Sequence, residues 1–431
     1  MSDLIEDLRR YADATSATVP PIELRRVRRH GRGGRRRLVA AAVVAALGFA
    51  GTVFALVDRP DPPALVTTQP STPTSEATAT SAEITETTTA EPSSWRLFPV
   101  TAMSDEEILV WAGEAGSEEA IRSDGFAINI ASGAVREIPP APIAARSGAT
   151  GVWTGSELIV CCGTGGADGT GTDTQSAAAW DPATGEWRTL ARPPDTVARS
   201  YPTAVWTGTQ MVVVSTGPGA ASYDPTTDSW TVITPPPIGG RQPQATWTGS
   251  DVVVWDPVYG TATVPPSADV ADRGWRWAPG DDRWTELPPL PVGSRTRLGS
   301  MAWTGTHLVV WGLSVEDDAV GVGARWRPGD SSWSPIAPAP QGPVADPFDG
   351  TIGSQAVVAG EGRVVVNGLN GGLTAAGEGP ANSLMLYEPN TDSWTTTSLS
   401  VPGYNPLFLV AEGRVFVPDR VRPLVGTLPA G

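Results

Sequence analysis

The sequence predicts an all-β domain built from a repeated four-stranded antiparallel unit, preceded by one membrane-spanning helix and a linker. Three observations lead to this prediction. A unit of roughly fifty residues recurs through residues 95–431, and each copy carries short apolar strands separated by tight turns. The 48 Gly and 42 Pro residues follow no collagen-like period and favour turns over a helical bundle. The 17 Trp residues outnumber the 7 Phe and the 6 Tyr, and 15 of the Trp fall at recurring positions of the unit.

Residues 1–37 form a basic leader with ten Arg and five acidic residues, whereas residues 38–431 carry a net charge of −21. The leader is too short to be a catalytic domain. Ser2 can cap a short amphipathic helix, whose apolar residues recur at helical spacing: Leu4, Ile5, Leu8 and Tyr11. Two interpretations fit this helix, a docking element for a cytoplasmic partner and a helix that lies on the membrane surface.

Residues 38–57 read LVAAAVVAALGFAGTVFALV and contain no charged residue. A helix of this length extends about 30 Å, the thickness of a bilayer's hydrocarbon core, and we therefore predict a transmembrane helix. Arg35, Arg36 and Arg37 precede it directly, so the positive-inside rule places the N-terminus in the cytoplasm and the following residues outside the cell. The alternative is a cleaved export signal, because residues 34–38 weakly resemble a twin-arginine motif, although no A-x-A cleavage site follows.

Residues 58–94 are rich in Pro, Thr, Ser, Ala and Glu and contain no aromatic residue. Such a segment cannot bury enough apolar surface to fold, and we predict a disordered linker. As a flexible tether it would reach on the order of 30–40 Å. Its composition fits an O-glycosylated stalk and a plain spacer equally well.

The repeated unit starts with an apolar strand, a Trp-Thr-Gly turn and a second β-branched strand. Four copies are VWTGSELIVCCG (152–163), VWTGTQMVVVSTG (205–217), TWTGSDVVVWDP (246–257) and AWTGTHLVVWGL (302–313). Three weaker copies are EILVWAG (107–113), VVAGEGRVVVNG (357–368) and LVAEGRVFVPD (409–419). Because apolar strands on both sides of a tight turn are typical of a β-hairpin, we expect seven such hairpins.

A second hairpin follows in each unit and is marked by two aromatic residues seven positions apart. Its copies are WDPATGEW (180–187), YDPTTDSW (223–230), WAPGDDRW (277–284), WRPGDSSW (326–333) and YEPNTDSW (387–394). INIASGAV (128–135) keeps this spacing with aliphatic residues. The separation of the two hairpins varies, which indicates a loop of changing length between the second and third strands.

Four-stranded units of about fifty residues are typical of β-propeller blades, and the seven first hairpins predict seven blades, with six as the alternative. The segment Trp95-Arg96-Leu97 resembles the outer strand Trp187-Arg188-Thr189-Leu190. We therefore expect it to complete the blade begun by residues 406–418 and to close the ring by strand pairing. The recurring Trp residues are expected to pack between neighbouring blades.

Residues 95–431 resemble the kelch family in the apolar run that ends in Gly, the aromatic residue before Asp-Pro and the Trp seven positions later. The resemblance implies a kelch-like β-propeller. The double Gly of the kelch pattern is replaced here by Cys162-Gly163, Gly312 and Asn367-Gly368. Some kelch-like propellers are copper oxidases that need two His ligands, but His307 is the only His after residue 57.

Motifs for catalysis are scarce, and we predict no catalytic, cofactor-binding or metal-binding residue. The sequence has no G-x-S-x-G motif, and two His and two Cys exclude a zinc finger or a multi-histidine metal centre. His307 follows a Trp-Thr-Gly turn, where we expect it to be exposed. Asp181 and Asp224 belong to turns, in which Asp bonds its own backbone. Gly185 stands four residues after Asp181, not two as in the Asp-boxes of sialidases.

Cys161 and Cys162 are adjacent in sequence and leave two alternatives open. Outside the cell, neighbouring cysteines can form a strained vicinal disulfide that acts as a rigid bump or a redox switch. Otherwise the two thiols lie on opposite faces of a strand, one packed inside and one outside.

Two classes of function fit the sequence. The first is a membrane-tethered extracytoplasmic binding or scaffold module, whose loops 163–177, 256–274, 314–323 and 337–352 would contact a protein or carbohydrate ligand. The acidic domain argues against nucleic acid as a partner. The second is a single-pass sensor that relays an outside signal to a cytoplasmic regulator through residues 1–37. A propeller enzyme without a recognisable motif is a third alternative.

Overall fold

The computed structural model describes residues of one compact unit, Ile84–Gly431. The described residues are 96–115, 120–165, 172–173, 175–197, 201–215, 219–239, 243–257, 272–281, 283–314, 321–340, 356–358, 362–369, 381–402, 409–416 and 424–428. The predicted leader (1–37), transmembrane helix (38–57) and linker (58–94) lie outside them. Every regular element among the described residues is a β-strand. None of these residues forms a helix long and apolar enough to cross a membrane.

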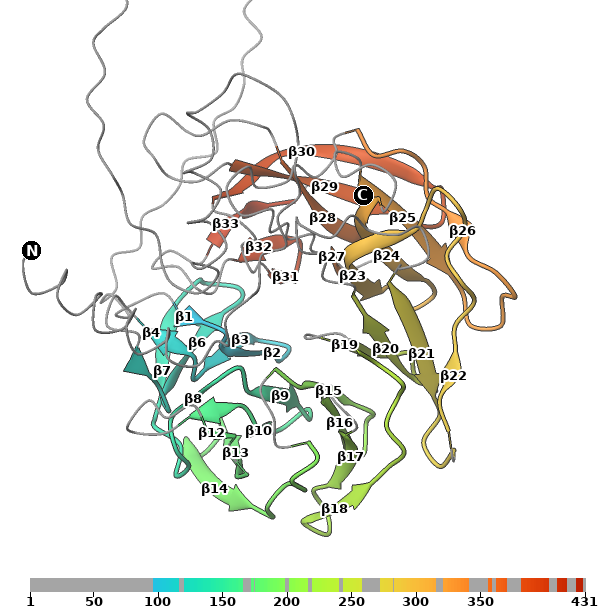
Figure 1. The fold of residues 1–431 in the computed structure, drawn as a ribbon. Coiled ribbons are helices and arrows are strands. Elements are labelled where there is room, and N and C mark those ends of the chain that lie inside the picture. The colour runs from blue at the N-terminus through green and yellow to red at the C-terminus, as the bar shows by residue number, and fades with distance from the viewer. Residues whose placement is uncertain are drawn as a thin grey trace, which may run out of the picture. The chain divides into compact units, whose positions relative to one another are not determined.

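The strands of the described residues form a seven-bladed β-propeller, as the repeat predicts (Figure 1). Within the described residues, six blades have four strands and the seventh has three. Blade 1 contains β2 (Val100–Met103), β3 (Glu107–Trp111), β6 (Gly125–Asn129) and β7 (Val135–Ile138). Blade 2 contains β9 (Thr150–Trp153), β10 (Leu158–Cys161), β13 (Ala177–Asp181) and β14 (Glu186–Leu190). Blade 3 contains β15 (Thr203–Trp206), β16 (Met211–Ser215), β17 (Gly219–Asp224) and β18 (Ser229–Val232).

The remaining blades follow in chain order. Blade 4 contains β19 (Gln244–Trp247), β20 (Val252–Asp256), β21 (Arg273–Trp277) and β22 (Thr285–Glu286). Blade 5 contains β23 (Thr296–Trp303), β24 (Leu308–Ser314), β25 (Gly321–Trp326) and β26 (Ser334–Pro335). Blade 6 contains β27 (Ala356–Val358), β28 (Val364–Leu369), β29 (Ala381–Glu388) and β30 (Ser393–Pro402). Blade 7 contains β31 (Leu409–Ala411), β32 (Arg414–Phe416) and β33 (Leu424–Thr427). The first strands of successive blades neighbour one another and therefore surround the central channel.

The Trp-Thr-Gly turn closes the first hairpin through the Thr side chain. In blade 2, the Thr154 hydroxyl accepts a hydrogen bond from the amide of Glu157 at 3.0 Å, and the Thr154 amide donates to the Glu157 carbonyl at 3.0 Å. Gly155 has a φ of 102°, which explains why Gly occupies this position. The same bonds recur at Thr207, Thr248 and Thr304, and Ser104 takes the role of Thr in blade 1.

The core of the propeller lies in the seams between neighbouring blades. The described residues hold seven clusters of buried apolar side chains, one for each seam of the closed ring. All fifteen recurring Trp residues belong to these clusters, and the prediction that they pack between blades is confirmed. The second strands are continuous apolar runs for this reason, since each blade is covered on both sides.

The outer-strand Trp of each marked hairpin also ties its blade to the preceding one. The indole N–H of Trp333 in blade 5 donates to the carbonyl of Pro288 in blade 4 at 2.7 Å. The other four such Trp residues donate in the same way across their seams, from Trp187 to Pro139, from Trp230 to Ala191, from Trp284 to Thr234 and from Trp394 to Ala337.

The prediction that residues 95–97 complete the last blade is wrong. Arg96 and Leu97 form β1 (Arg96–Leu97), which pairs with β4 (Glu114–Ala115) in a small sheet that also contains β5 (Ala120–Ile121). The reason is the buried guanidinium of Arg96. It donates to the carbonyls of Ala112 and Asp124 at 3.0 Å each and so holds β1 against blade 1.

The ring closes between blades 7 and 1 by side-chain packing instead. Phe416 and Ala411 of blade 7 pack against buried residues of blade 1, namely Ile108, Val110, Phe126, Ile128 and Ile130. Arg414 donates a hydrogen bond to the carbonyl of Ile130 at 2.8 Å. Closure thus uses the same kind of apolar seam as the other six junctions.

Candidate functional site

The four loops 163–177, 256–274, 314–323 and 337–352 leave the ring on one face. In an antiparallel blade, the second strand ends and the third begins at the edge where the first strand begins, and the chain passes to the next blade from that same edge. Three of these loops join the second and third strands of blades 2, 4 and 5, and the fourth joins blade 5 to blade 6. We call this side of the propeller the loop face. Most residues of the four loops lie outside the described part of the chain.

A buried Arg precedes the first strand of blade 1 and of blade 2, on the loop face. Each guanidinium donates to a carbonyl after the second strand and a carbonyl before the third strand of its blade. Arg96 reaches Ala112 and Asp124, and Arg146 reaches Cys162 and Ser176, the latter pair at 3.1 Å. Burial lowers the pKa of both side chains, and that of Arg146 falls to about 10, which is still above neutral pH.

We did not predict these Arg clamps, although a spacing in the sequence marks them. Arg stands seven residues before the last residue of the first strand in three successive blades: Arg96 before Met103, Arg146 before Trp153 and Arg199 before Trp206. Arg199 lies outside the described residues. The spacing is visible without a structure, but its meaning depends on carbonyl groups that lie up to thirty residues away in the chain.

The clamped carbonyls belong to residues with an unusual backbone conformation. Ala112 and Cys162 have left-handed backbones, with φ of 60° and 66°, and each is followed by a Gly with positive φ. This conformation favours Gly. The chain places Ala and Cys there, and the Arg clamp holds the strained carbonyl in position.

A second row of left-handed residues precedes the innermost strands of blades 1, 2 and 3 and lies at the mouth of the central channel on the loop face. Phe98, Gly148 and Tyr201 stand two residues before the innermost strands β2, β9 and β15, with φ of 52°, 57° and 52°. The Gly148 amide donates to the Phe98 carbonyl at 3.2 Å, and the Tyr201 amide donates to the Gly148 carbonyl at 2.8 Å. Backbone hydrogen bonds thus join blades 1, 2 and 3 around the channel mouth.

An aromatic pair and a carboxylate meet at this mouth. The rings of Phe98 and Tyr201 make an edge-to-face contact with centroids 5.2 Å apart. A Glu114 oxygen accepts a hydrogen bond from the Ser147 hydroxyl at 2.7 Å. Burial raises the pKa of the Tyr201 hydroxyl, and the negative charge of Glu114 raises it further, as expected for two neighbouring groups.

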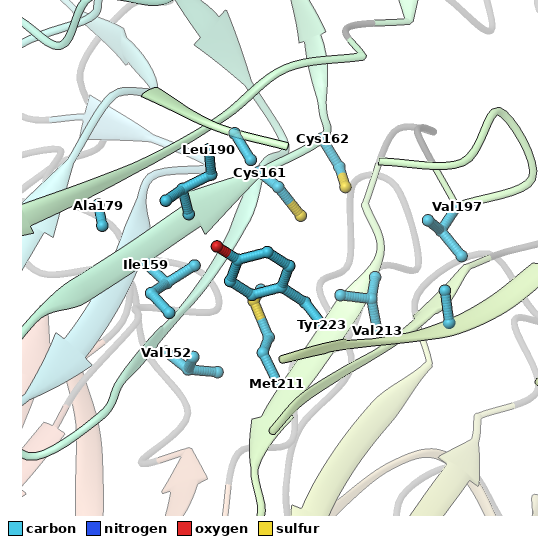
Figure 2. Close-up of a cluster of buried hydrophobic side chains, with 12 residues drawn as sticks. Val152, Ile159, Cys161, Cys162, Ala179, Leu190, Val197, Met211, Val213 and Tyr223 are labelled. Atoms are coloured by element: carbon cyan, nitrogen blue, oxygen red, sulfur yellow. The ribbon is translucent and has the colours of Figure 1, made fainter. Parts of the chain in front are cut away.

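Cys161 and Cys162 are both free thiols in the structure, and both are buried. They do not lie on opposite faces of the strand. The left-handed backbone of Cys162 ends the alternation after Cys161, so both sulfurs enter the seam between blades 2 and 3, beside Tyr223 and Met211 (Figure 2). The vicinal disulfide stays a prediction for the oxidised protein.

His307 is buried, and the expectation that it is exposed at its turn is wrong. His307 precedes β24 and Arg327 follows β25, and these two strands are paired. The Arg327 Nε therefore reaches the imidazole and donates a hydrogen bond to His307 Nε2 at 2.7 Å. Burial lowers the pKa of His307, and Arg327 and Arg325 lower it further, so the imidazole is neutral at pH 7. No three His, Cys, Asp or Glu side chains in the described part of the chain gather where they could hold a metal ion.

A cavity of about 850 Å³ lies between blades 4 and 5. Its lining combines the buried side chains of Trp255 and Asp272 with the exposed Arg273 and Glu286, which lie 3.8 Å apart. The Asp272 carboxylate accepts hydrogen bonds from Thr296 Oγ1 and the Gly299 amide, both at 2.8 Å. The Asp272 carboxylate therefore links blade 4 to the first strand of blade 5.

These features define a seven-bladed β-propeller whose variable loops gather on one face. No family model matches the chain, and no curated protein matches it. Among solved structures, the chain is similar to one described as "Structure of YjhT", with 13% sequence identity and a TM-score of 0.47. The match covers 72% of this chain and 99% of that chain.

Proposed function

We propose that the chain is a membrane-tethered extracytoplasmic binding module of the kelch type. Residues 95–431 would form the binding domain, residues 38–57 the membrane anchor and residues 58–94 the linker that separates them. The ligand would be a protein or a carbohydrate outside the cell.

One observation carries this proposal: four loops of unequal length emerge on the same face of a closed ring. The seams of the ring are packed with buried apolar side chains, and the hairpins are closed by repeated hydrogen bonds. Such a scaffold holds loops in fixed relative positions while their sequences vary, which is the usual basis of recognition by loops. The charge of residues 95–431, with 35 acidic residues against 19 Arg, favours cationic or neutral partners over nucleic acid.

Binding is tested with the full chain in lipid nanodiscs, screened against glycans and secreted proteins. Ligands that bind are retested against variants in which loop 256–274 or 314–323 is replaced by a Gly-Ser segment of equal length. The matched control is Ser156→Ala, in an exposed turn on the opposite face. We expect the loop variants to lose affinity and the control to keep it. Chemical conversion of a ligand would instead establish an enzyme.

The topology is tested separately by tagging both ends of the chain and treating intact cells with protease. We expect removal of the C-terminal tag and protection of the N-terminal tag, as the charges beside residues 38–57 predict. Loss of the N-terminal tag during export, with release of the domain, would show that the apolar segment is a cleaved signal.

A further inference from the structure

The mouth of the central channel carries side chains that the packing of the ring does not require. The backbone there needs a left-handed residue in each of blades 1, 2 and 3, and Gly148 meets this need without strain. Phe98 and Tyr201 occupy the equivalent positions, where a side chain makes the same conformation unfavourable. Non-Gly residues in such positions concentrate at functional sites.

Phe98 is also exposed. It keeps 44% of its surface accessible and, among the large hydrophobic residues that are exposed in the described part of the chain, it alone is aromatic. Its ring is held by the edge-to-face contact with Tyr201. Tyr201 in turn leaves no room for a side chain at Gly148, since a Cβ there would approach its ring to 2.9 Å. The two rings are thus fixed in place while one of them faces solvent.

The third member, Glu114, is a half-buried carboxylate that forms no ion pair with any described residue. It lies on β4 directly opposite Leu97, the residue before Phe98. Elsewhere, comparable carboxylates have Arg partners, such as Glu107 with Arg136 and Glu157 with Arg188. Among the described residues Glu114 accepts only the Ser147 hydroxyl, and no Arg pairs with it. Its charge therefore remains available at the channel mouth.

We propose that Phe98, Tyr201 and Glu114 form a recognition site for an organic cation, the guanidinium or ammonium group of a partner polypeptide. Aromatic rings attract cations through their faces, and a carboxylate beside the ring adds direct charge attraction. The net negative charge of the propeller domain favours cationic partners in general. This inference rests on the proposed binding function and specifies the chemistry of its ligand.

The test places 4-fluorophenylalanine at position 98 of the full chain in nanodiscs and follows its fluorine resonance. Acetyl-Gly-Arg-Gly-amide is titrated against the same peptide with citrulline, which has the shape of Arg without its charge. Choline is titrated against its uncharged isostere 3,3-dimethylbutan-1-ol. We expect a saturable shift with both cations and at least tenfold weaker binding of both neutral probes. Tighter binding of the Arg peptide than of choline identifies the polypeptide as the source of the cation. The reverse order would overturn the polypeptide assignment.

Variants separate the site from general charge attraction. Glu114→Gln, which can still accept from Ser147, and Tyr201→Ala should each weaken the Arg peptide at least tenfold. Met103→Ala is the matched control, because Met103 ends the same strand β2 on the opposite face and is 45% exposed. Equal binding of the Arg and citrulline peptides, or an unchanged affinity in Glu114→Gln, would overturn the proposal.

A final variant distinguishes this site from the proposed function as a whole. Phe98→Gly removes the ring and suits the left-handed backbone, so the fold is preserved, as circular dichroism checks. If a partner found in the screen binds Phe98→Gly as well as the native chain, the binding module stands and the cation site fails. If it binds the variant at least tenfold more weakly, the partner uses this site.

Discussion

Left-handed backbone positions determine much of what individual residues do in this propeller. Cys162 shows this most clearly, since its φ of 66° turns the chain out of β10 and directs a second thiol into the seam where Cys161 already lies. Strand alternation alone would place one of two adjacent side chains outside. The buried Arg146, which donates to the Cys162 carbonyl, holds this conformation.

The burial of Cys162 predicts a loss of stability at alkaline pH. Burial raises the pKa of the Cys162 thiol, and the interaction with Cys161 raises it further. In the unfolded chain the pKa of a Cys thiol is about 8.5. The folded state therefore holds the proton more tightly, and this contribution is complete below the unfolded pKa and is lost as pH rises above it. We expect the urea midpoint to fall more between pH 8 and 10 in the native chain than in Cys162→Ala.

Thiol counting is the control for this prediction. The denatured chain should titrate with two free thiols, the state that the structure describes. A count of zero that rises to two after reduction would establish the vicinal disulfide, and the alkaline difference between the native chain and Cys162→Ala should then appear only under reducing conditions.

At the scale of single elements, the hairpins were predictable because their causes are local. The Thr hydroxyl and the Gly of the Trp-Thr-Gly turn act within four residues, as at Thr154. The spacing of seven between the aromatic residues of the second hairpin likewise places them opposite each other, as in the register of Trp180 and Trp187. By contrast, the prediction for β1 was wrong because the position of this strand is set by a hydrogen bond from Arg96 to Asp124, 28 positions away in the chain.

We expect substitutions of an outer-strand Trp to lower the free energy of unfolding in steps, according to what each substitution removes. Trp333 is buried, packs against Trp255 of the preceding blade with ring centroids 5.8 Å apart, and donates to the Pro288 carbonyl. Trp333→Phe keeps a ring but loses the hydrogen bond, and should cost about 1–3 kcal/mol because the carbonyl is left without its donor. Trp333→Ala should cost about 3–5 kcal/mol through the cavity it leaves. Equilibrium unfolding in urea measures both.

Trp187→Phe is the matched control for this prediction. Trp187 makes the same indole bond, to Pro139, but this bond is exposed to solvent, and water can replace the lost donor. We expect its cost to be clearly below that of Trp333→Phe. Equal costs at the two sites would contradict the role given to burial.

At the scale of the whole molecule, the ring is closed by an apolar seam between its first and last blades. Phe416 is fully buried in this seam and contacts the cluster of blade 1 that includes Ile108 and Phe126. Because closure depends on packing between residues from opposite ends of the domain, it should be lost locally before the other seams open.

Phe416→Ala tests this closure. We expect a loss of about 3–5 kcal/mol in the free energy of unfolding and faster hydrogen exchange in β31, β32, β2 and β3, with little change in blade 4. Phe416→Leu, which keeps most of the volume, should show a smaller effect at the same amides. Faster exchange spread evenly over all blades would argue against a distinct closing seam.

The sequence by itself determined the class of fold and the role of the recurring Trp residues, and it favoured seven blades over six. These properties repeat with the period of the unit and arise from contacts within a hairpin or between equivalent positions of adjacent blades. The anchor, the linker and the orientation of the chain remain predictions from charge and composition. Only the tertiary structure decided how the ring closes, which Arg side chains are buried and that His307 is covered. It also brought Phe98, Tyr201 and Glu114 together, because two backbone hydrogen bonds and the side-chain bond from Ser147 to Glu114 connect segments of three blades that lie far apart in the chain.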